Sequence, residues 1–289
     1  MESLKVIRRR IRSVTSTKQI TKAMQMVAAA RLRKAQAKLE TSRPYAFKMQ
    51  EILENLSTVS GFVENPLFKK RNEIKKTLLI LITSDRSLCG SYNSNLINFT
   101  TSVLSQYSTP SIELGLIGRK GFDFYKRRSW PIKFNYLHVG GNIPFVQIKE
   151  LTNQTVESFL TGEVDEVFLI YTKFLNIASR KIVFEKFLNI EKPQERKSAE
   201  VFDYIFEPDP AEIFNGLLPR YCITKIQMAI LESGTSEQSA RMLAMQQATK
   251  NAEEMVEYLT WVRNKARQAS ITKEILEIAS GAEALKEFS

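Results

Sequence analysis

The chain has 289 residues, 43% of them hydrophobic, and a net charge of +11 at pH 7. This is enough for one or two domains with a core. The best apolar run, Leu78–Ile82, has the length of a strand and cannot span a bilayer. The two cysteines, Cys89 and Cys222, cannot form a disulfide framework. We therefore expect a protein of a reducing compartment that reaches a membrane only through a partner.

Both ends of the chain lack residues that break helices. All nine prolines lie between Pro44 and Pro219, and every glycine except Gly281 lies between Gly61 and Gly234. Residues 1–43 and 235–280 can therefore each form one continuous helix of roughly 65 Å. Because each helix carries only a narrow apolar stripe, we expect the two to pair as an antiparallel coiled coil.

The spacing of apolar residues predicts which positions of each terminal helix face the other helix. Leu4, Ile7, Ile11 and Val14 recur at three- and four-residue spacing in the first helix. We expect the phase to change after them, through the residues Ile20, Met24 and Val27. In the last helix, a first phase holds Met255, Leu259, Val262, Ala266 and Ala269, and a second holds Ile271, Ile275, Ile278, Ala282 and Leu285. Polar side chains nearby are either solvated or partner contacts: Lys18, Gln25, Arg267 and Gln268.

The middle of the chain alternates strand and helix patterns, which predicts an α/β layer with a partly parallel sheet. The expected strands are Thr77–Thr83, Ile112–Gly118, Ile132–His138, Glu166–Thr172 and Lys181–Ile190. The expected helices are Tyr92–Tyr107, Gly121–Arg128, Pro144–Leu160 and Pro210–Leu231. The last strand alternates polar and apolar residues, which favours an antiparallel edge strand. The charged stretch Glu191–Glu200 is expected to be a loop.

Nearly all of the excess positive charge lies on the first helix. Residues 1–43 hold 12 Lys and Arg against 2 Glu, whereas residues 235–289 hold 7 against 8. A basic helix indicates an acidic partner, which can be nucleic acid, anionic lipid or an acidic protein surface.

The loop Thr83–Asn93 follows the first strand, where α/β proteins bind ligands. It lacks the Gly-Lys-Ser/Thr of a phosphate loop. Cys89 with His138, the only histidine, is a weak nucleophile-and-base candidate. The favoured interpretation is a structural turn in which Ser84 or Asp85 caps the next helix. No carboxylate–histidine cluster has the spacing of a metal site. Gly115, Gly118 and Gly121 are too sparse for a dinucleotide fingerprint, although the strand before them keeps that alternative open. We predict no catalytic, metal or cofactor residue.

Three segments resemble the gamma subunit of the F-type, proton-translocating ATP synthase of bacteria. They are IRSVTSTKQITKAMQMVAAARLRKAQ (Ile11–Gln36), SDRSLCGSYN (Ser84–Asn93), and ARMLAMQQATKNA (Ala240–Ala252) with NKARQASITKEILEIASGAEAL (Asn264–Leu285). The resemblance implies an α/β fold in which a long antiparallel coiled coil of the terminal helices joins a central Rossmann-like domain. The implied parts are an N-terminal shaft helix, the central α/β domain and a C-terminal shaft helix, at residues 1–60, 75–200 and 209–289.

The same resemblance implies a rotor in the central stalk, one copy per complex. It would couple proton-driven rotation of the c-ring to conformational change at the beta-subunit catalytic sites. The implied partners are three alpha and three beta subunits, the epsilon subunit and the c-ring, with no nucleic acid. The chain would bind no nucleotide or cofactor and would lie peripherally at the cytoplasmic face of the bacterial inner membrane.

Residue-by-residue correspondence with the family suggests contacts to the beta ring. The implied contact residues are Lys22, Met24, Arg241, Arg267, Gln268, Thr272 and Glu274. Ser87 and Ser91 stand where the family loop usually has glycine, so the turn must differ if those positions need positive φ. Two rival classes are a basic coiled-coil nucleic-acid binder and an α/β enzyme with helical arms. The first explains the basic helix but not the uncharged alanine-rich seam, and the second lacks residues for chemistry.

Overall fold

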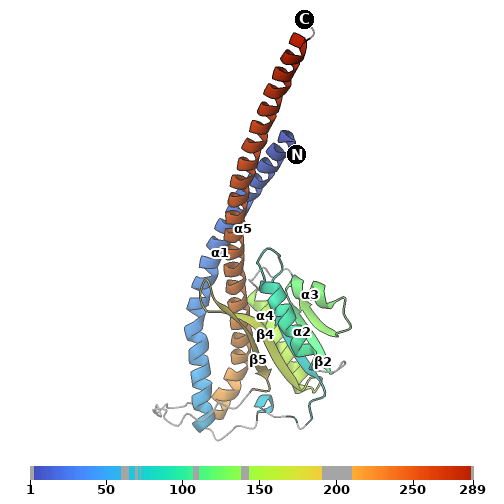
Figure 1. Cartoon of the computed structure of the whole chain (residues 1–289). Coiled ribbons are helices and arrows are strands. Elements are labelled where there is room, and N and C mark those ends of the chain that lie inside the picture. The colour runs from blue at the N-terminus through green and yellow to red at the C-terminus, as the bar shows by residue number, and fades with distance from the viewer. Residues whose placement is uncertain are drawn as a thin grey trace. The chain divides into compact units, whose positions relative to one another are not determined.

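The computed structural model describes residues 3–59, 65–68, 71, 73–106, 111–137, 143–190 and 210–287. The chain splits into two compact units, a larger one of residues 28–241 and a smaller one of residues 1–27 with 242–289. Two long helices contribute to both units, α1 (Leu4–Val59) and α5 (Pro210–Glu287) (Figure 1). The expected loop Glu191–Glu200 and the residue His138 lie outside the described parts of the chain.

A five-stranded sheet organises the larger unit. Its strands are β1 (Thr77–Ile82), β2 (Ile112–Ile117), β3 (Ile132–Tyr136), β4 (Glu166–Phe174) and β5 (Arg180–Leu188). The order is β3-β2-β1-β4-β5, and only β5 runs antiparallel to its neighbour. All five expected strands are present, and the expected antiparallel edge strand is confirmed.

The central strand β1 contributes to two hydrophobic clusters, one on each face of the sheet. All six of its residues are buried. Leu78 and Ile80 enter one hydrophobic cluster, whereas Leu79 and Leu81 enter the other, because successive side chains of a strand point to opposite faces. Helices α4 (Phe145–Leu160) and α5 pack in the first cluster, and α2 (Tyr92–Leu104) and α3 (Arg119–Tyr125) in the second. Both faces of the sheet are therefore covered, as a mainly parallel sheet requires.

The two terminal helices extend beyond the stretches 1–43 and 235–280 that are free of proline and glycine. α1 has 56 residues and continues through Pro44, and α5 has 78 residues and continues through Pro219. The prediction of a separate helix Pro210–Leu231 was therefore wrong. Proline removes one backbone donor and crowds the preceding turn. Burial of Leu218 and Cys222 on either side of exposed Pro219 stabilises the helix enough to offset this cost.

Buried positions of α1 keep one heptad phase, and the expected phase change was wrong. Ile20 and Val27 are 58% and 52% exposed, and only Met24 of the expected phase is half-buried. Lys18, Thr21 and Gln25 occupy the seam instead. The buried or half-buried seam runs through Leu4, Ile7, Ile11, Val14, Lys18, Thr21, Gln25, Ala28, Leu32, Ala35, Leu39, Ser42, Ala46, Met49, Leu53 and Leu56.

In the smaller unit the two helices pair antiparallel, as predicted. The hydroxyl of Thr249 donates to that of Thr21 at 2.9 Å, and Lys18 forms a 2.5 Å ion pair with Glu253. Residue numbers therefore fall along α5 as they rise along α1. These two contacts explain the polar seam positions Lys18 and Thr21, because each of these side chains has a partner across the pair.

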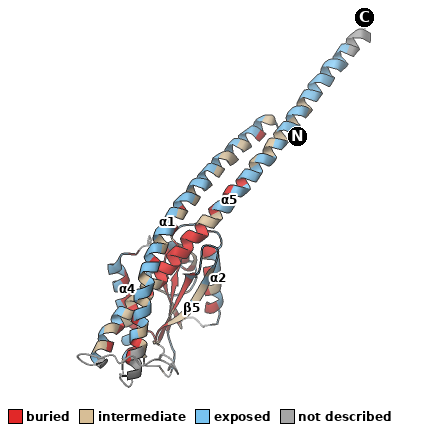
Figure 2. Cartoon of the chain, turned by 90° about the vertical axis from the view of Figure 1, so that its left-hand side faces the viewer, coloured by how far each residue is buried: buried red, intermediate tan, exposed pale blue. Residues whose placement is uncertain are grey.

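The expected seam of α5 is partly confirmed. Leu259, Val262, Ala266 and Ala269 are half-buried, but Met255 is 52% exposed. Every residue from Ile271 to Ala282 is exposed, so these members of the second expected phase have no cover within the smaller unit (Figure 2). The side chain of Leu285, the last member of this phase, lies outside the described part of the chain.

Candidate functional site

The predicted contact residues do not form one site. Lys22 is exposed and Met24 half-buried on α1, beside the Thr21–Thr249 contact. Arg267, Gln268, Thr272 and Glu274 are exposed on α5. About 20 helical residues separate the level of Thr249 from Arg267, which corresponds to roughly 30 Å along the helix. The smaller unit thus carries two separate patches on one pair of helices.

The patch on α5 lies on a helical stretch rich in exposed apolar side chains. The hydroxyl of Thr272 donates to the carbonyl of Gln268 at 2.9 Å, so it is used within the helix. Ile275 and Ile278 are 60% and 73% exposed. Apolar exposure of this extent marks an interaction surface. The patch therefore fits contact with another protein better than it fits binding of a small polar ligand.

Arg241 has a different place from the other six residues. It lies in the larger unit, is only 7% exposed, and forms a 2.6 Å ion pair with Glu237. Its guanidinium also donates to the carbonyls of Arg86 and Ser87, both at 3.3 Å. Burial raises the pKa of Glu237, and the nearby Arg241 acts in the opposite direction. Arg241 therefore anchors the loop after β1 to α5.

That loop is held by a local network rather than built around a ligand. The backbone N–H and the hydroxyl of Ser84 both donate to the side-chain carbonyl of Asn93, at 3.1 and 3.0 Å. The carboxylate of Asp85 accepts from the backbone N–H of Arg119 at 3.0 Å. The prediction that Ser84 or Asp85 caps the next helix was wrong, because Asp85 caps α3 and Ser84 bonds the first turn of α2.

Positive φ angles occur in this loop at Leu88 (67°) and Gly90 (59°). Ser91 has a φ of −81°, and Ser87 is not among the described residues with positive φ. Serine at positions 87 and 91 therefore causes no backbone strain.

Cys89 is a core residue of the same loop. It is 1% exposed, and burial raises the pKa of its thiol above the ordinary value. A raised pKa disfavours the thiolate that a nucleophile needs. His138, the other member of this weak candidate pair, lies outside the described residues. Within the parts of the chain that the structure describes, no group of three His, Cys, Asp or Glu side chains could hold a metal ion.

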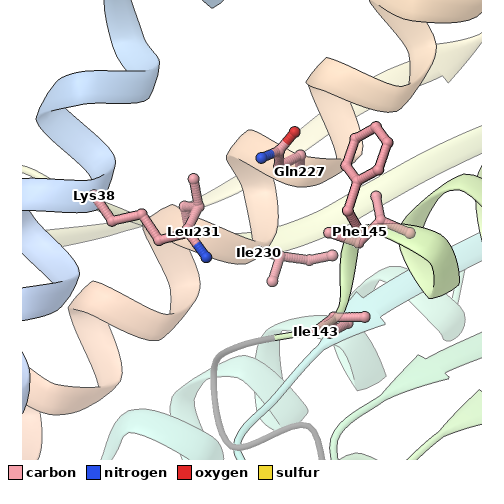
Figure 3. A pocket seen from close by; sticks show the side chains of 7 residues that line it. Lys38, Ile143, Phe145, Gln227, Ile230 and Leu231 are labelled. Carbon is pink, nitrogen blue, oxygen red and sulfur yellow. The ribbon is translucent and has the colours of Figure 1, made fainter.

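A small cavity lies in the larger unit (Figure 3). It has a volume of about 60 Å³, and Lys38 of α1 reaches toward Leu231 of α5 beside it. Its remaining lining residues are Ile143, Phe145, Ile148, Gln227 and Ile230. Ligand pockets usually measure about 300–1,000 Å³. This cavity is therefore too small for a nucleotide.

The sequence predicts that α1 and α5 pair, but the polar contacts between them were not predicted. The hydrogen bond from Lys18 lowers the pKa of Glu253 below its ordinary value. The available signal was the heptad itself, since Lys18 and Thr21 continue the spacing of Leu4, Ile7, Ile11 and Val14. A polar residue at such a position selects register in coiled coils.

Comparison with known proteins identifies the family. The family model described as ATP synthase matches residues 3–285. The ATP synthase gamma chain of Protochlamydia amoebophila is 44% identical over 286 residues, covering 99% of this chain and 100% of that protein. The gamma chain of Moorella thermoacetica is 46% identical with the same coverage. The chain belongs to the ATP synthase gamma-chain family.

Solved structures agree with this family assignment. A chain of the central stalk and c-ring structure of the Tetrahymena thermophila mitochondrial ATP synthase is 28% identical. It matches with a TM-score of 0.61, over 79% of this chain and 99% of that one. A chain of the Euglena gracilis mitochondrial ATP synthase has a TM-score of 0.66 at 17% identity, covering 98% and 94%, which supports the fold. Among the described helices, none combines the length and apolarity needed to cross a bilayer.

Proposed function

We propose that this chain is the rotor in the central stalk of an ATP synthase. One copy would stand inside a ring of three alpha and three beta subunits and would bind the epsilon subunit and the c-ring. Proton-driven rotation of the c-ring would turn it, and it would impose conformational changes on the catalytic sites of the beta subunits. The chain itself would bind no nucleotide and catalyse no reaction.

The observation that carries this proposal is a pair of unlike antiparallel helices in a chain related over its whole length to gamma chains. The N-terminal 43 residues carry a net charge of +10, whereas residues 235–289 carry −1. The two sides of the pair therefore differ. A single asymmetric shaft binds three otherwise equal sites unequally, and differential affinity shifts each site toward a different conformation.

Six exposed or half-exposed residues are proposed as contacts to the beta ring. They are Lys22, Met24, Arg267, Gln268, Thr272 and Glu274, all in the smaller unit. Arg241 is left out of this proposal, because its side chain is buried and bonded within the larger unit. The basic face of α1 suits an acidic protein surface.

The proposed location is the cytoplasmic face of the bacterial inner membrane. The absence of a described helix able to span a bilayer is compatible with attachment through the c-ring and the epsilon subunit.

Native mass spectrometry tests the proposal directly. The chain is mixed with alpha and beta subunits of the same source, and the complex is weighed. We expect one copy of the chain for three copies each of alpha and beta, and no ATP hydrolysis by the purified chain alone. Two or more copies per hexamer, or ATP turnover by the isolated chain, would contradict a rotor. Salt-sensitive DNA binding without subunit binding would favour the nucleic-acid alternative.

A further inference from the structure

Strand β4 extends beyond the strand that pairs with it in the centre of the sheet. β1 pairs with β4 in parallel from Glu166 to Ile170, whereas β4 continues to Phe174. The pairing with β5 on the other side continues to Phe174. Backbone groups of β4 that face β1 after Ile170 therefore need other partners, since a buried unpaired group is costly.

Side chains of α5 and α1 take those positions. The backbone N–H of Thr172 donates to the hydroxyl of Ser233 at 3.2 Å, and the hydroxyl of Ser236 donates to the carbonyl of Thr172 at 3.1 Å. Two residues further along, the N–H of Phe174 donates to the carboxylate of Glu232 at 2.8 Å.

Arg43 of α1 completes the arrangement. It donates to the carbonyl of Phe174 at 3.1 Å and to the carboxylate of Glu232 at 2.9 Å. Both backbone groups of Thr172 and of Phe174 are thus bonded by side chains. We call Arg43, Glu232, Ser233 and Ser236 the side-chain ladder.

The side-chain ladder explains why a buried stretch of α5 is rich in polar residues. All residues from Ala229 to Arg241 are buried, and many of them are polar (Figure 2). Ser236 is 0% and Glu232 5% exposed. Ser239 extends the same face of the helix by donating to the carbonyl of Ile177. These polar side chains form the hydrogen bonds to β4 that a neighbouring strand would otherwise form. Their polarity is therefore required by the backbone groups of β4.

We propose that the side-chain ladder is the joint that carries torque between the helices and the sheet of the larger unit. This inference rests on the proposed rotor function. Hydrophobic contacts are non-directional and allow sliding. Hydrogen bonds from fixed side chains to the backbone of two defined residues resist a shift of the strand along the helix, and each bond that is lost weakens this resistance. Its four members are positioning residues, and both α1 and α5 contribute to it.

Amide hydrogen exchange tests whether the ladder holds the strand. In the variant Ser233→Ala, exchange of the Thr172 amide should accelerate about tenfold, which corresponds to the ~1.4 kcal/mol of one lost hydrogen bond. Thr235→Val is the matched control, because Thr235 is equally buried on the same helix and its hydroxyl donates to the carbonyl of Leu231 within that helix. Equal exchange of the Thr172 amide in Ser233→Ala and wild type would overturn the ladder.

Coupling measurements test whether the ladder carries torque. The double variant Ser233→Ala/Ser236→Ala is assembled into the full complex in membrane vesicles, and ATP hydrolysis and proton pumping are measured together. We expect hydrolysis by the membrane-free complex to match wild type, with fewer protons pumped per ATP in vesicles. Thr235→Val should pump as wild type does. Unchanged pumping per ATP in an assembled double variant would overturn the torque role.

The outcomes separate the two proposals. If wild-type chain fails to assemble with alpha and beta subunits, the rotor function itself fails. If wild type assembles and couples but the double variant couples equally well, only the joint is refuted. Should the double variant not fold, Ser236→Ala alone removes one bond and is judged by the same pumping ratio.

Discussion

The fold of the larger unit requires an unusual backbone conformation at Gly118. It lies between β2 and α3, as the N-cap residue of α3, with a φ of 93°, a region that residues with a Cβ rarely adopt. A Cβ at this position would collide with the carbonyl of Thr83. The close approach lets the Thr83 hydroxyl accept from the N–H of Gly121 at 2.9 Å and so fix the start of the helix.

We therefore predict that Gly118→Ala destabilises the chain by about 2 kcal/mol or more. Gly216→Ala is the matched control, because Gly216 lies within α5 and a Cβ there has nothing within 4 Å. This control should be stabilised by about 0.5–1 kcal/mol. Urea unfolding of the purified chains measures both. Equal midpoints for Gly118→Ala and wild type would show that the φ of Gly118 is not a constraint.

The ion pair between Lys18 and Glu253 should titrate in the acid range. The hydrogen bond from Lys18 lowers the pKa of Glu253 from an ordinary 4.5. Because the folded pKa is the lower one, the pair stabilises the helices fully above the unfolded pKa, and this contribution is lost as pH falls through the folded pKa. In Lys18→Gln, we expect the pKa of Glu253 to rise toward 4.5, as measured by carboxyl NMR titration. Glu254, which pairs with Lys250 instead, serves as the control within the same helix. An unchanged Glu253 titration would contradict the pairing.

Among the elements, α1 and α5 show where sequence patterns suffice and where they fail. The strands of the larger unit were predictable because β-branched and aliphatic runs alternate with helical patterns. The seam of α1 was predicted incorrectly after Val14 because apolar Ile20 and Val27 were followed instead of the heptad spacing. Nothing local to the sequence shows that Thr21 and Thr249 lie opposite each other, since that contact depends on residues 228 positions apart.

The polar stretch of α5 shows a second limit of the sequence. Ser233 and Ser236 have the composition of a solvated face, but they are buried against β4. Their role depends on where β1 ends relative to β4. The sequence of α5 does not show the register of these strands. The contact residues on α5 could be suggested only by the family resemblance. Arg267 and Gln268 are exposed, and no sequence pattern distinguishes them from other exposed polar residues of the helix.

We predict that the antiparallel register is fixed at Thr21 and Thr249. With both replaced by cysteine, oxidation should give an intramolecular disulfide, because the two hydroxyl oxygens are 2.9 Å apart. The offset pair Thr21→Cys/Val256→Cys should not link, since seven residues correspond to about 10 Å along a helix. Native Cys89 and Cys222 are both buried and should react slowly. Links formed only by the offset pair, or only between chains, would refute this register.

For the whole molecule, the proposed rotor function separates coupling from folding. Arg267 and Gln268 are exposed on α5, and alanine at both positions keeps helix propensity. We expect the double variant Arg267→Ala/Gln268→Ala to unfold within about 0.5 kcal/mol of wild type. It should assemble, but ATP turnover should fall by roughly tenfold, the effect of losing about 1.4 kcal/mol of transition-state stabilisation.

The control for this variant is Lys48→Ala/Glu51→Ala, which removes an ion pair of α1 in the larger unit. It should assemble and turn over ATP as wild type does. Wild-type turnover by the assembled Arg267→Ala/Gln268→Ala variant would refute the contact role of these two residues.

The unbroken heptad of α1 also gives the helix pair a mechanical handedness. A seven-residue repeat is shorter than two turns of an ideal helix, so helices that keep it coil around each other in the left-handed sense. Twisting such a pair in one direction tightens the winding and presses the seam together, whereas twisting it in the other direction opens the seam. A shaft made this way has unequal torsional stiffness for the two senses of twist. In the proposed rotor the driving end and the resisting end exchange places between synthesis and hydrolysis, so both directions of rotation would twist the pair in the same sense.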